Sequence, residues 1–431
     1  MALFATLWAR GQGGTVVASS ENRSALDDLQ WLGLSWDEMA APIDSKRAAQ
    51  KGQELIAAGK AYPCFCSVAE LREMTVNTLN FPESVLYDQR CRGLSAVDRA
   101  ALEKLGRKWR VRIDVPPVSP EIAGVETLPV RSDFAVVELD GTPTALFSSV
   151  LSASDANATD LLVDGSRAHE LAHWWVVAEA LGWQGPRLHL IPPWLSPEGL
   201  PIGQKADGLS ISELRARGFH PSALLRAAAT AGWEAGESSD LTAMASRFRV
   251  EDVSPDSPTL DMDALLKLNG DTLRGLDRAL LVEAIGDHLD RKGFPFSERD
   301  TRWKERFVGA VATEMTTLSD AEEWASVLLT STADYDREVA RVLRAPETQT
   351  LIAEFTRAMG NIEGDGEDTR AWRSVLADFR RDSAAPGRAL VTLRLVLTGQ
   401  REGPGLPSVL TLLGVDGCRQ RLEKARRYAG G

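Results

Sequence analysis

The sequence predicts two classes of structure in one chain, an α/β half up to about residue 200 and an all-helical half after it. Helix-like and strand-like segments alternate through the first half, which is typical of a sheet with crossover helices. Beyond residue 200 the apolar spacing is predominantly helical. With 431 residues, 44% of them apolar, the chain is long enough to bury two or three hydrophobic cores.

The α/β half begins with a helix followed by a strand. Residues 2–10 have the spacing of an amphipathic helix, and residues 15–18 form a short apolar run suited to a buried parallel strand. Helix then strand is half of a Rossmann unit. Further along, residues 133–139 are strand-like, and residues 169–181 have helical spacing that ends at a glycine.

The helical half begins after residue 210. Residues 211–233 predict two short helices, broken at Gly218 and Pro221. The Pro- and Ser-containing segment 250–261 then predicts a linker into the remaining helices.

Charge and hydropathy limit the partners. A net charge of −12 gives no general attraction to nucleic acid, so RNA binding requires local basic patches. No run of about twenty apolar residues exists to span a bilayer, and the first residues are a poor match to a secretory signal. We therefore expect a cytoplasmic protein without a membrane partner.

Three of the four cysteines cluster in the sequence with a tyrosine. Cys64 and Cys66 are followed by Tyr87 and Cys91, which offers three thiolates and a phenolate for a tetrahedral zinc site. The alternative is three free cysteines in a site that has lost its metal. Cys418 stands alone and is expected in a core.

A second metal-binding pattern must be weighed. His169, Glu170 and His173 spell HExxH, which in zinc hydrolases places two imidazoles on one helix face beside a glutamate that activates water. Arg167 sets a charge next to the motif and no obvious third ligand follows. A metallohydrolase is therefore the remote alternative.

Several segments together resemble one family in its own order along the chain. They are LRLVLTGQREGPGLPSVLTLLG at 393–414, ALFATLWARGQGG at 2–14, GKAYPCFCSVAELREM at 59–74, ELDGTPTALFSSVLSASDANATDLLVDG at 138–165 and LDMDALLKLNGDTLRGLD at 260–277. This collinear set resembles the bacterial glutamyl-tRNA synthetases, which are class I aminoacyl-tRNA synthetases. The Tyr-x3-Cys spacing resembles the related glutamyl-queuosine tRNA synthetases, in which tyrosine is the fourth zinc ligand.

The resemblance implies a domain order. Residues 1–200 would form the Rossmann-type catalytic domain, with an inserted acceptor-stem and zinc subdomain at 62–130. Residues 201–254 would form a helical stem-contact region and residues 255–431 the all-α anticodon-binding domains. The family's first strand and its HIGH motif would lie upstream of Met1.

The chain departs from the family where ATP and glutamate are bound. At the KMSKS-type loop it has PIGQK, so only Lys205 retains an ammonium group. Ala145 and Leu146 stand where the family has a Tyr-Asn pair, and the acidic turn of the family is replaced by ASSENRS at 18–24. Losing one such electrostatic group costs about 10² to 10³ in rate. The prediction is lost or impaired glutamate adenylation, so ATP is a cofactor by resemblance only; the alternative is an active glutamate–tRNA ligase with a misassigned start.

The resemblance also implies tRNA, and tRNA-Glu in particular, as the partner. Three arginines are the first candidates for contact with it: Arg215, Arg217 and Arg401. Further basic clusters are Arg380, Arg381 and Arg388, and the C-terminal Arg419, Arg421, Lys424, Arg426 and Arg427. A protein partner in a tRNA-dependent pathway also fits, and nothing in the sequence selects among these pathways.

Overall fold

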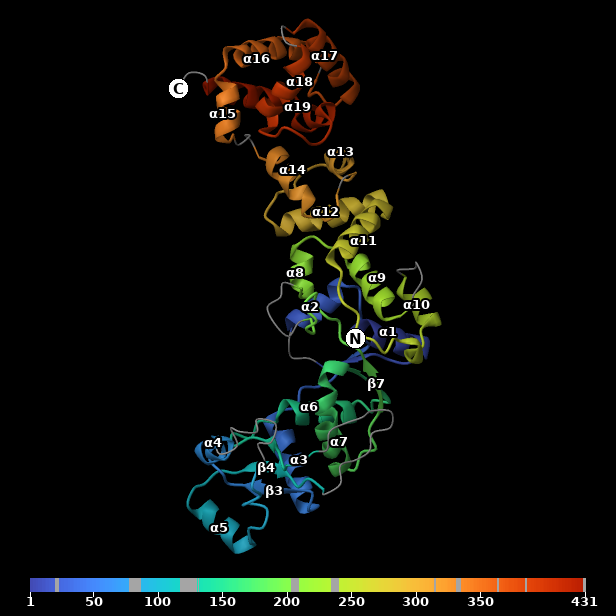
Figure 1. Ribbon diagram of the computed structural model, residues 1–431, viewed down its shortest axis with the longest axis vertical. Coiled ribbons are helices and arrows are strands. Elements are labelled where there is room, and N and C mark those ends of the chain that lie inside the picture. Colours follow the sequence, from blue (N-terminus) through green and yellow to red (C-terminus); the bar gives the residue numbers. More distant parts are fainter. Residues whose placement is uncertain are drawn as a thin grey trace. The chain divides into compact units, whose positions relative to one another are not determined.

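The computed structural model describes residues 1–19, 23–76, 87–116, 130, 132–202, 209–233, 240–313, 315–330, 335–362, 364–383 and 386–428. The chain divides into two compact units (Figure 1). The first holds Met1–Asp207 and Leu225–Leu260, and the second holds Gly208–Leu224 and Asp261–Gly431. All strands of the described residues lie in the first unit, so the prediction of an α/β half followed by an all-helical half is confirmed.

The strands of the described residues form three small sheets. Two sheets are parallel pairs: β1 (Val17–Ala18) with β2 (Glu38–Met39), and β6 (Asp160–Asp164) with β7 (Arg187–Ile191). The third is antiparallel, in the order β3 (Ala61–Cys64), β4 (Arg110–Ile113) and β5 (Ala135–Val137).

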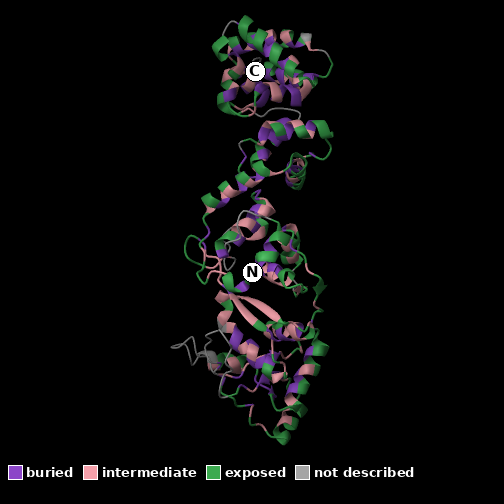
Figure 2. Ribbon diagram, turned by 90° about the vertical axis from the view of Figure 1, so that its right-hand side faces the viewer, coloured by how far each residue is buried: buried purple, intermediate pink, exposed green. Residues whose placement is uncertain are grey.

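The two parallel pairs are separate sheets. No strand of the described residues joins β1 to β6. All five residues of β6 are only half-buried, and β6 and β7 appear mostly in the intermediate colour in Figure 2. A parallel sheet is normally covered on both faces. The pair of β6 and β7 is therefore less buried than is usual for a parallel sheet.

The helices of the first unit surround these sheets. They are α1 (Ala2–Gly11), α2 (Arg23–Trp31), α3 (Ser45–Ala57), α4 (Val68–Val76), α5 (Ala96–Lys104), α6 (Ala145–Asp155), α7 (Leu171–Ala180), α10 (Leu241–Arg247) and most of α9 (Pro221–Gly232), with 3-10 turns η1 (Gly165–Glu170) and η2 (Val250–Asp252). The main core packs α3, α6 and α7 on β4 and β5, around Val111, Phe147 and Val177.

The helix expected over 169–181 begins differently. Its first residues belong to η1, and α7 starts only at Leu171. The Asp164 carboxylate accepts a hydrogen bond from the Ser166 backbone N–H and so caps the tighter 3-10 turn. The expected linker 250–261 also proves to be anchored within the first unit, since Leu195 exchanges backbone hydrogen bonds with Pro258 and Leu260.

The second unit is helical throughout its described residues. Its helices are α8 (Ile211–Ala216), the start of α9, α11 (Met262–Gly275), α12 (Arg278–Arg291), α13 (Thr301–Val311), α14 (Asp320–Leu328), α15 (Arg337–Leu343), α16 (Pro346–Ala358), α17 (Thr369–Asp382), α18 (Pro386–Thr398) and α19 (Leu406–Arg427), with 3-10 turn η3 (Met359–Asn361). One core gathers α12, α13 and α14 around Phe307, and the other gathers α15 to α19 around Trp372. Among the described residues, no helix is long and apolar enough to cross a membrane.

Candidate functional site

Four residues that the sequence proposed as metal ligands lie together in a buried cluster, called here the cysteine–tyrosine cluster. Cys64 ends β3, Cys66 follows it, and Tyr87 and Cys91 come from the segment before α5. The Tyr87 hydroxyl oxygen lies 3.4 Å from the Cys64 sulfur and 3.6 Å from the Cys66 sulfur. The three sulfurs lie within 4.8 Å of one another, and none forms a disulfide.

This geometry fits a tetrahedral ion. Thiolates bound to zinc at about 2.3 Å stand roughly 3.8 Å apart, and the Cys66 and Cys91 sulfurs are separated by 3.6 Å. A hydrogen bond with the Cys91 thiol is the main reason that the pKa of Cys64 is well below its usual range, whereas the same bond and burial raise the pKa of Cys91. Within the described parts of the chain, no other group of His, Cys, Asp or Glu side chains is arranged for a metal.

A hydrogen-bond network anchored on Asp133 supports the cluster. The buried Asp133 carboxylate accepts from the Tyr62 hydroxyl at 2.6 Å and from the Val115 backbone N–H at 3.0 Å. Its backbone carbonyl accepts from the Arg112 guanidinium at 2.7 Å. Burial, and then the bond to Asp133, raise the pKa of Tyr62. The guanidinium of Arg112 in turn lies over the Tyr87 ring, 3.9 Å from its centroid.

The HExxH motif is divided between two elements. Glu170 forms an ion pair with Arg167 at 2.5 Å, and His173 in α7 packs edge-on against Phe134 at 5.0 Å. The side chain of His169 lies outside the described residues. The described side chains of the motif therefore make structural contacts, and nothing in them favours a metallohydrolase.

The predicted tRNA contacts fall in different surroundings. Arg215 lies in the last turn of α8, and Arg217 follows it with its guanidinium 5.6 Å from the Phe219 ring. Burial, and then repulsion by Arg215, hold the pKa of Arg291 in α12 below its usual range. Arg401 forms an ion pair with Glu338.

Lys205 and Arg421 are two further residues that the sequence proposed for function. Lys205 lies outside the described residues. Arg421 is only 1% exposed, so its prediction as an RNA contact is wrong. It donates hydrogen bonds to the carbonyl oxygens of Leu397 and Thr330 and so binds helix ends inside the second unit.

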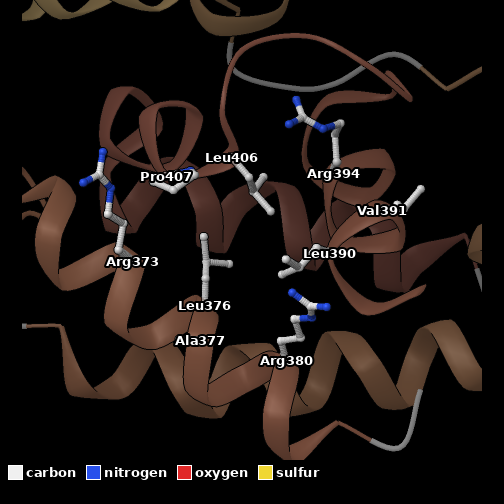
Figure 3. Close-up of a pocket in the computed structure, with 9 residues that line it drawn as sticks. All are labelled: Arg373, Leu376, Ala377, Arg380, Leu390, Val391, Arg394, Leu406 and Pro407. Atoms are coloured by element: carbon white, nitrogen blue, oxygen red, sulfur yellow. The ribbon is translucent and has the colours of Figure 1, made fainter. Parts of the chain in front are cut away.

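The structure also brings together a surface groove that the sequence did not reveal as a unit. It encloses about 450 Å³ between α17, α18 and the start of α19, and we call it the arginine groove. Its lining residues are Arg373, Leu376, Ala377, Arg380, Leu390, Val391, Arg394, Leu406 and Pro407. Figure 3 shows the three arginines standing around the apolar side chains.

The three guanidinium groups of the arginine groove have no acidic partner in the part of the chain that the structure describes. Among the described residues, no carboxylate forms an ion pair with Arg373, Arg380 or Arg394, whereas the neighbouring Arg381 pairs with Asp378. Arg394 is held in place by a 2.8 Å hydrogen bond to the Pro404 carbonyl, and burial lowers its pKa.

Sequence reasoning named only Arg380 of these three. The seven-residue spacing of Arg373 and Arg380, two turns of one helix, was the available signal.

Comparison with known proteins places this architecture. Residues 18–267 match the family model described as tRNA synthetases class I (E and Q), catalytic domain, and residues 280–426 match the anticodon binding domain. The chain is 26% identical over 462 residues to glutamate–tRNA ligase 2 of Syntrophus aciditrophicus, covering 100% of this chain and 94% of the relative. It is also 26% identical to the glutamate–tRNA ligase of Heliobacterium modesticaldum, covering 100% and 93%.

Solved structures share the fold. The crystal structure of a glutamate tRNA ligase from Elizabethkingia meningosepticum aligns with a TM-score of 0.67 at 18% identity, covering 99% of this chain and 95% of that one. The predicted order of a class I catalytic domain followed by helical anticodon-binding structure is confirmed. Because the catalytic-domain model alone matches more than half of its length, this chain belongs to the glutamyl-tRNA synthetase family.

Proposed function

We propose that this protein binds tRNA through its helical second unit, with the arginine groove receiving unstacked nucleotides and their phosphates. The groove lies in the part of the chain that matches the anticodon binding domain. The proposal rests on its three guanidinium groups, which form no ion pair with a carboxylate of the described residues. The printed names of the relatives, glutamate–tRNA ligases, support tRNA-Glu as the tRNA.

The groove has the chemistry that single-stranded RNA requires. A guanidinium donates hydrogen bonds in a planar fork that suits a phosphate or the acceptor edge of a base. Leu390 and the 52% exposed Val391 provide an apolar surface for base faces. In a chain of net charge −12, such local charge is what allows RNA to bind.

The test is a binding titration with tRNA-Glu on the full chain. Arg373→Ala combined with Arg380→Ala should lower the affinity about tenfold or more at low salt, and should lower the slope of log K against log salt by about 2. The matched control is Arg381→Ala on the same helix, because Arg381 is already ion-paired with Asp378 and Asp382. Equal affinity of the double variant and the wild type would exclude the groove as the binding site.

We further propose that glutamate adenylation is lost or impaired. Leu146, at the place of a polar family residue, packs against the core of the first unit and offers no hydrogen bond to a substrate. Asp164 ends β6, at the edge of a parallel sheet where doubly wound folds bind ligands. A carboxylate at such an edge would repel a polyphosphate rather than stabilise it. An assay of glutamate-dependent pyrophosphate exchange distinguishes this proposal from the alternative, an active ligase.

The proposal includes one zinc ion at the cysteine–tyrosine cluster. Cys64, Cys66 and Cys91 would hold it as thiolates, with the Tyr87 oxygen as the fourth ligand. A closed site of four protein ligands is structural and supplies folding energy rather than chemistry. Such an ion would tie the end of β3 to the segment before α5, within the region expected to contact the acceptor stem. The proposal also includes a cytoplasmic location, because tRNA is used in the cytoplasm. It further includes a protein partner in a tRNA-dependent pathway.

A further inference from the structure

Arg112 lies directly behind the cysteine–tyrosine cluster. It sits on β4 opposite Tyr62 of β3, two residue pairs along the strands from the pair formed by Cys64 and Arg110. Its side chain is buried, with 6% of the residue exposed, and its guanidinium carbon lies 3.9 Å from the Tyr87 ring centroid. Burying a guanidinium is costly unless an opposite charge or hydrogen bonds compensate it.

The compensation that Arg112 receives from the described residues is incomplete. One of its terminal nitrogens donates to the Asp133 carbonyl oxygen, and its Nε has no hydrogen-bond partner among them. No carboxylate of the described residues forms an ion pair with it. The Asp133 carboxylate instead lies 3.8 Å from the guanidinium of Arg92, which also pairs with Asp114.

The cluster beside Arg112 would supply the missing charge if it held a metal. Three thiolates around a dication leave a net charge of −1, and an ionised tyrosine would make it −2. A buried anionic centre next to a guanidinium is stabilised, and the face of the Tyr87 ring attracts the same cation.

We propose that Arg112 is a positioning residue of the cysteine–tyrosine cluster. It holds the Tyr87 ring with its oxygen facing the three sulfurs and offsets the negative charge of the loaded site. This inference rests on the zinc site proposed above. Groups that orient metal ligands from behind typically change metal affinity by about 10- to 100-fold.

The test measures zinc affinity of the full chain by competition with a chromogenic chelator. Arg112→Gln removes the charge and keeps a donor for the Asp133 carbonyl, so affinity should fall about 10- to 100-fold. Arg112→Lys keeps the charge without the planar group, so its zinc affinity should lie between those of Arg112→Gln and the wild type. The matched control is Arg110→Gln, because Arg110 is equally buried on the same strand and faces Glu138 at 3.4 Å. That variant should bind zinc as the wild type does.

A spectroscopic readout separates positioning from simple loss of stability. In the cobalt-substituted protein, Arg112→Gln should change the ligand-field bands in the same direction as Tyr87→Phe, while the sulfur-to-cobalt charge-transfer bands of three thiolates persist. If Arg112→Gln does not fold, Arg112→Lys and Tyr87→Phe are combined instead, and their effects on zinc affinity should be non-additive.

Wild-type affinity and an unchanged cobalt spectrum in Arg112→Gln, or additive effects of Arg112→Lys and Tyr87→Phe, would overturn the role of Arg112 and leave the zinc site standing. A wild-type protein that binds zinc no better than Cys64→Ser would overturn both.

Discussion

The sulfur atoms of Cys66 and Cys91 lie 3.6 Å apart, although 25 residues separate them in the sequence. They are neither bonded to each other nor exposed, and both face the sulfur of Cys64. The cluster therefore places thiols at the separation of metal ligands rather than at the bond length of a disulfide, which is about 2.05 Å.

The first prediction is one zinc ion per chain. Elemental analysis or native mass spectrometry should find it in the wild type, and Cys91→Ser should lose it because a three-ligand site binds zinc far more weakly. Cys418→Ser provides the control, since Cys418 is a buried core residue of α19. Zinc retained in Cys91→Ser, or absent from the wild type, would show that the cluster is not a zinc site.

The second prediction is that glutamate-dependent pyrophosphate exchange is absent or far below the rate of an active synthetase. At the position of the family's KMSKS-type loop, PIGQK leaves Lys205 as the one ammonium group, and each lost electrostatic group costs about 10² to 10³ in rate. By resemblance, Lys205 belongs to a loop that binds ATP, so Lys205→Ala should leave tRNA affinity unchanged. Exchange at a normal synthetase rate would instead establish the active ligase.

The third prediction concerns the salt dependence of tRNA binding. If about three to five phosphates are contacted, log K should fall against log salt with a slope of roughly −2 to −5. Binding to tRNA-Glu should exceed binding to other tRNAs, because an acidic chain makes few non-specific contacts. Equal affinity for every tRNA would contradict the specificity, and no binding at low salt would contradict the function.

The fourth prediction is that Arg421→Met destabilises the second unit by about 2 kcal/mol or more, because carbonyls buried at the ends of α14 and α18 lose their donor. Thermal unfolding should show a lower melting temperature, with faster hydrogen exchange in both helices. Arg419→Ala is the control, since Arg419 is exposed and its one ion pair among the described residues is with Asp416 on the same helix. Equal melting temperatures for the two variants would refute the capping role.

The fifth prediction is a loss of stability below about pH 6.5 that involves His288. Its ring is 1% exposed, its Nε2 lies 2.7 Å from the Glu322 carboxylate, and its Nδ1 has no partner among the described residues. Burial lowers the pKa of His288 despite Glu322, and Lys292 and Arg291 lower it further.

The sign follows from proton binding. The unfolded chain takes up a proton near pH 6.5 while the folded ring does so only at lower pH, so stability is full above about pH 6.5 and falls as the pH drops toward the folded-state pKa. Urea unfolding between pH 8 and pH 5 should show this fall, and His288→Gln should weaken it. Burial also lowers the pKa of His220, so His220 would account for the rest of the loss of stability. If His288→Gln shows the same pH dependence of stability as the wild type, other residues cause the whole loss.

Much of the fold could be predicted because its signals are local. Apolar spacing placed α1, α8 and α9 within a residue or two, since helical periodicity depends only on neighbours along the chain. The prediction of an α-helix from residue 169 was wrong at its first residues, because the side chain of Asp164 caps a 3-10 turn there. The four proposed metal ligands could be named because Cys-x-Cys and Tyr-x3-Cys are short spacings in the sequence.

The sequence by itself determined the fold class, the family and the identity of the cluster residues, because these depend on local patterns and on their order along the chain. Only the tertiary structure decided which arginines have no acidic partner among the described residues. Arg421 reaches the carbonyl of Thr330 across 91 residues, Arg401 pairs with Glu338 across 63, and Arg394 joins Arg373 and Arg380 around one groove. The charge of an arginine is fixed by its chemistry, but its partner is fixed by which helices pack together, and that contact leaves no trace in local spacing.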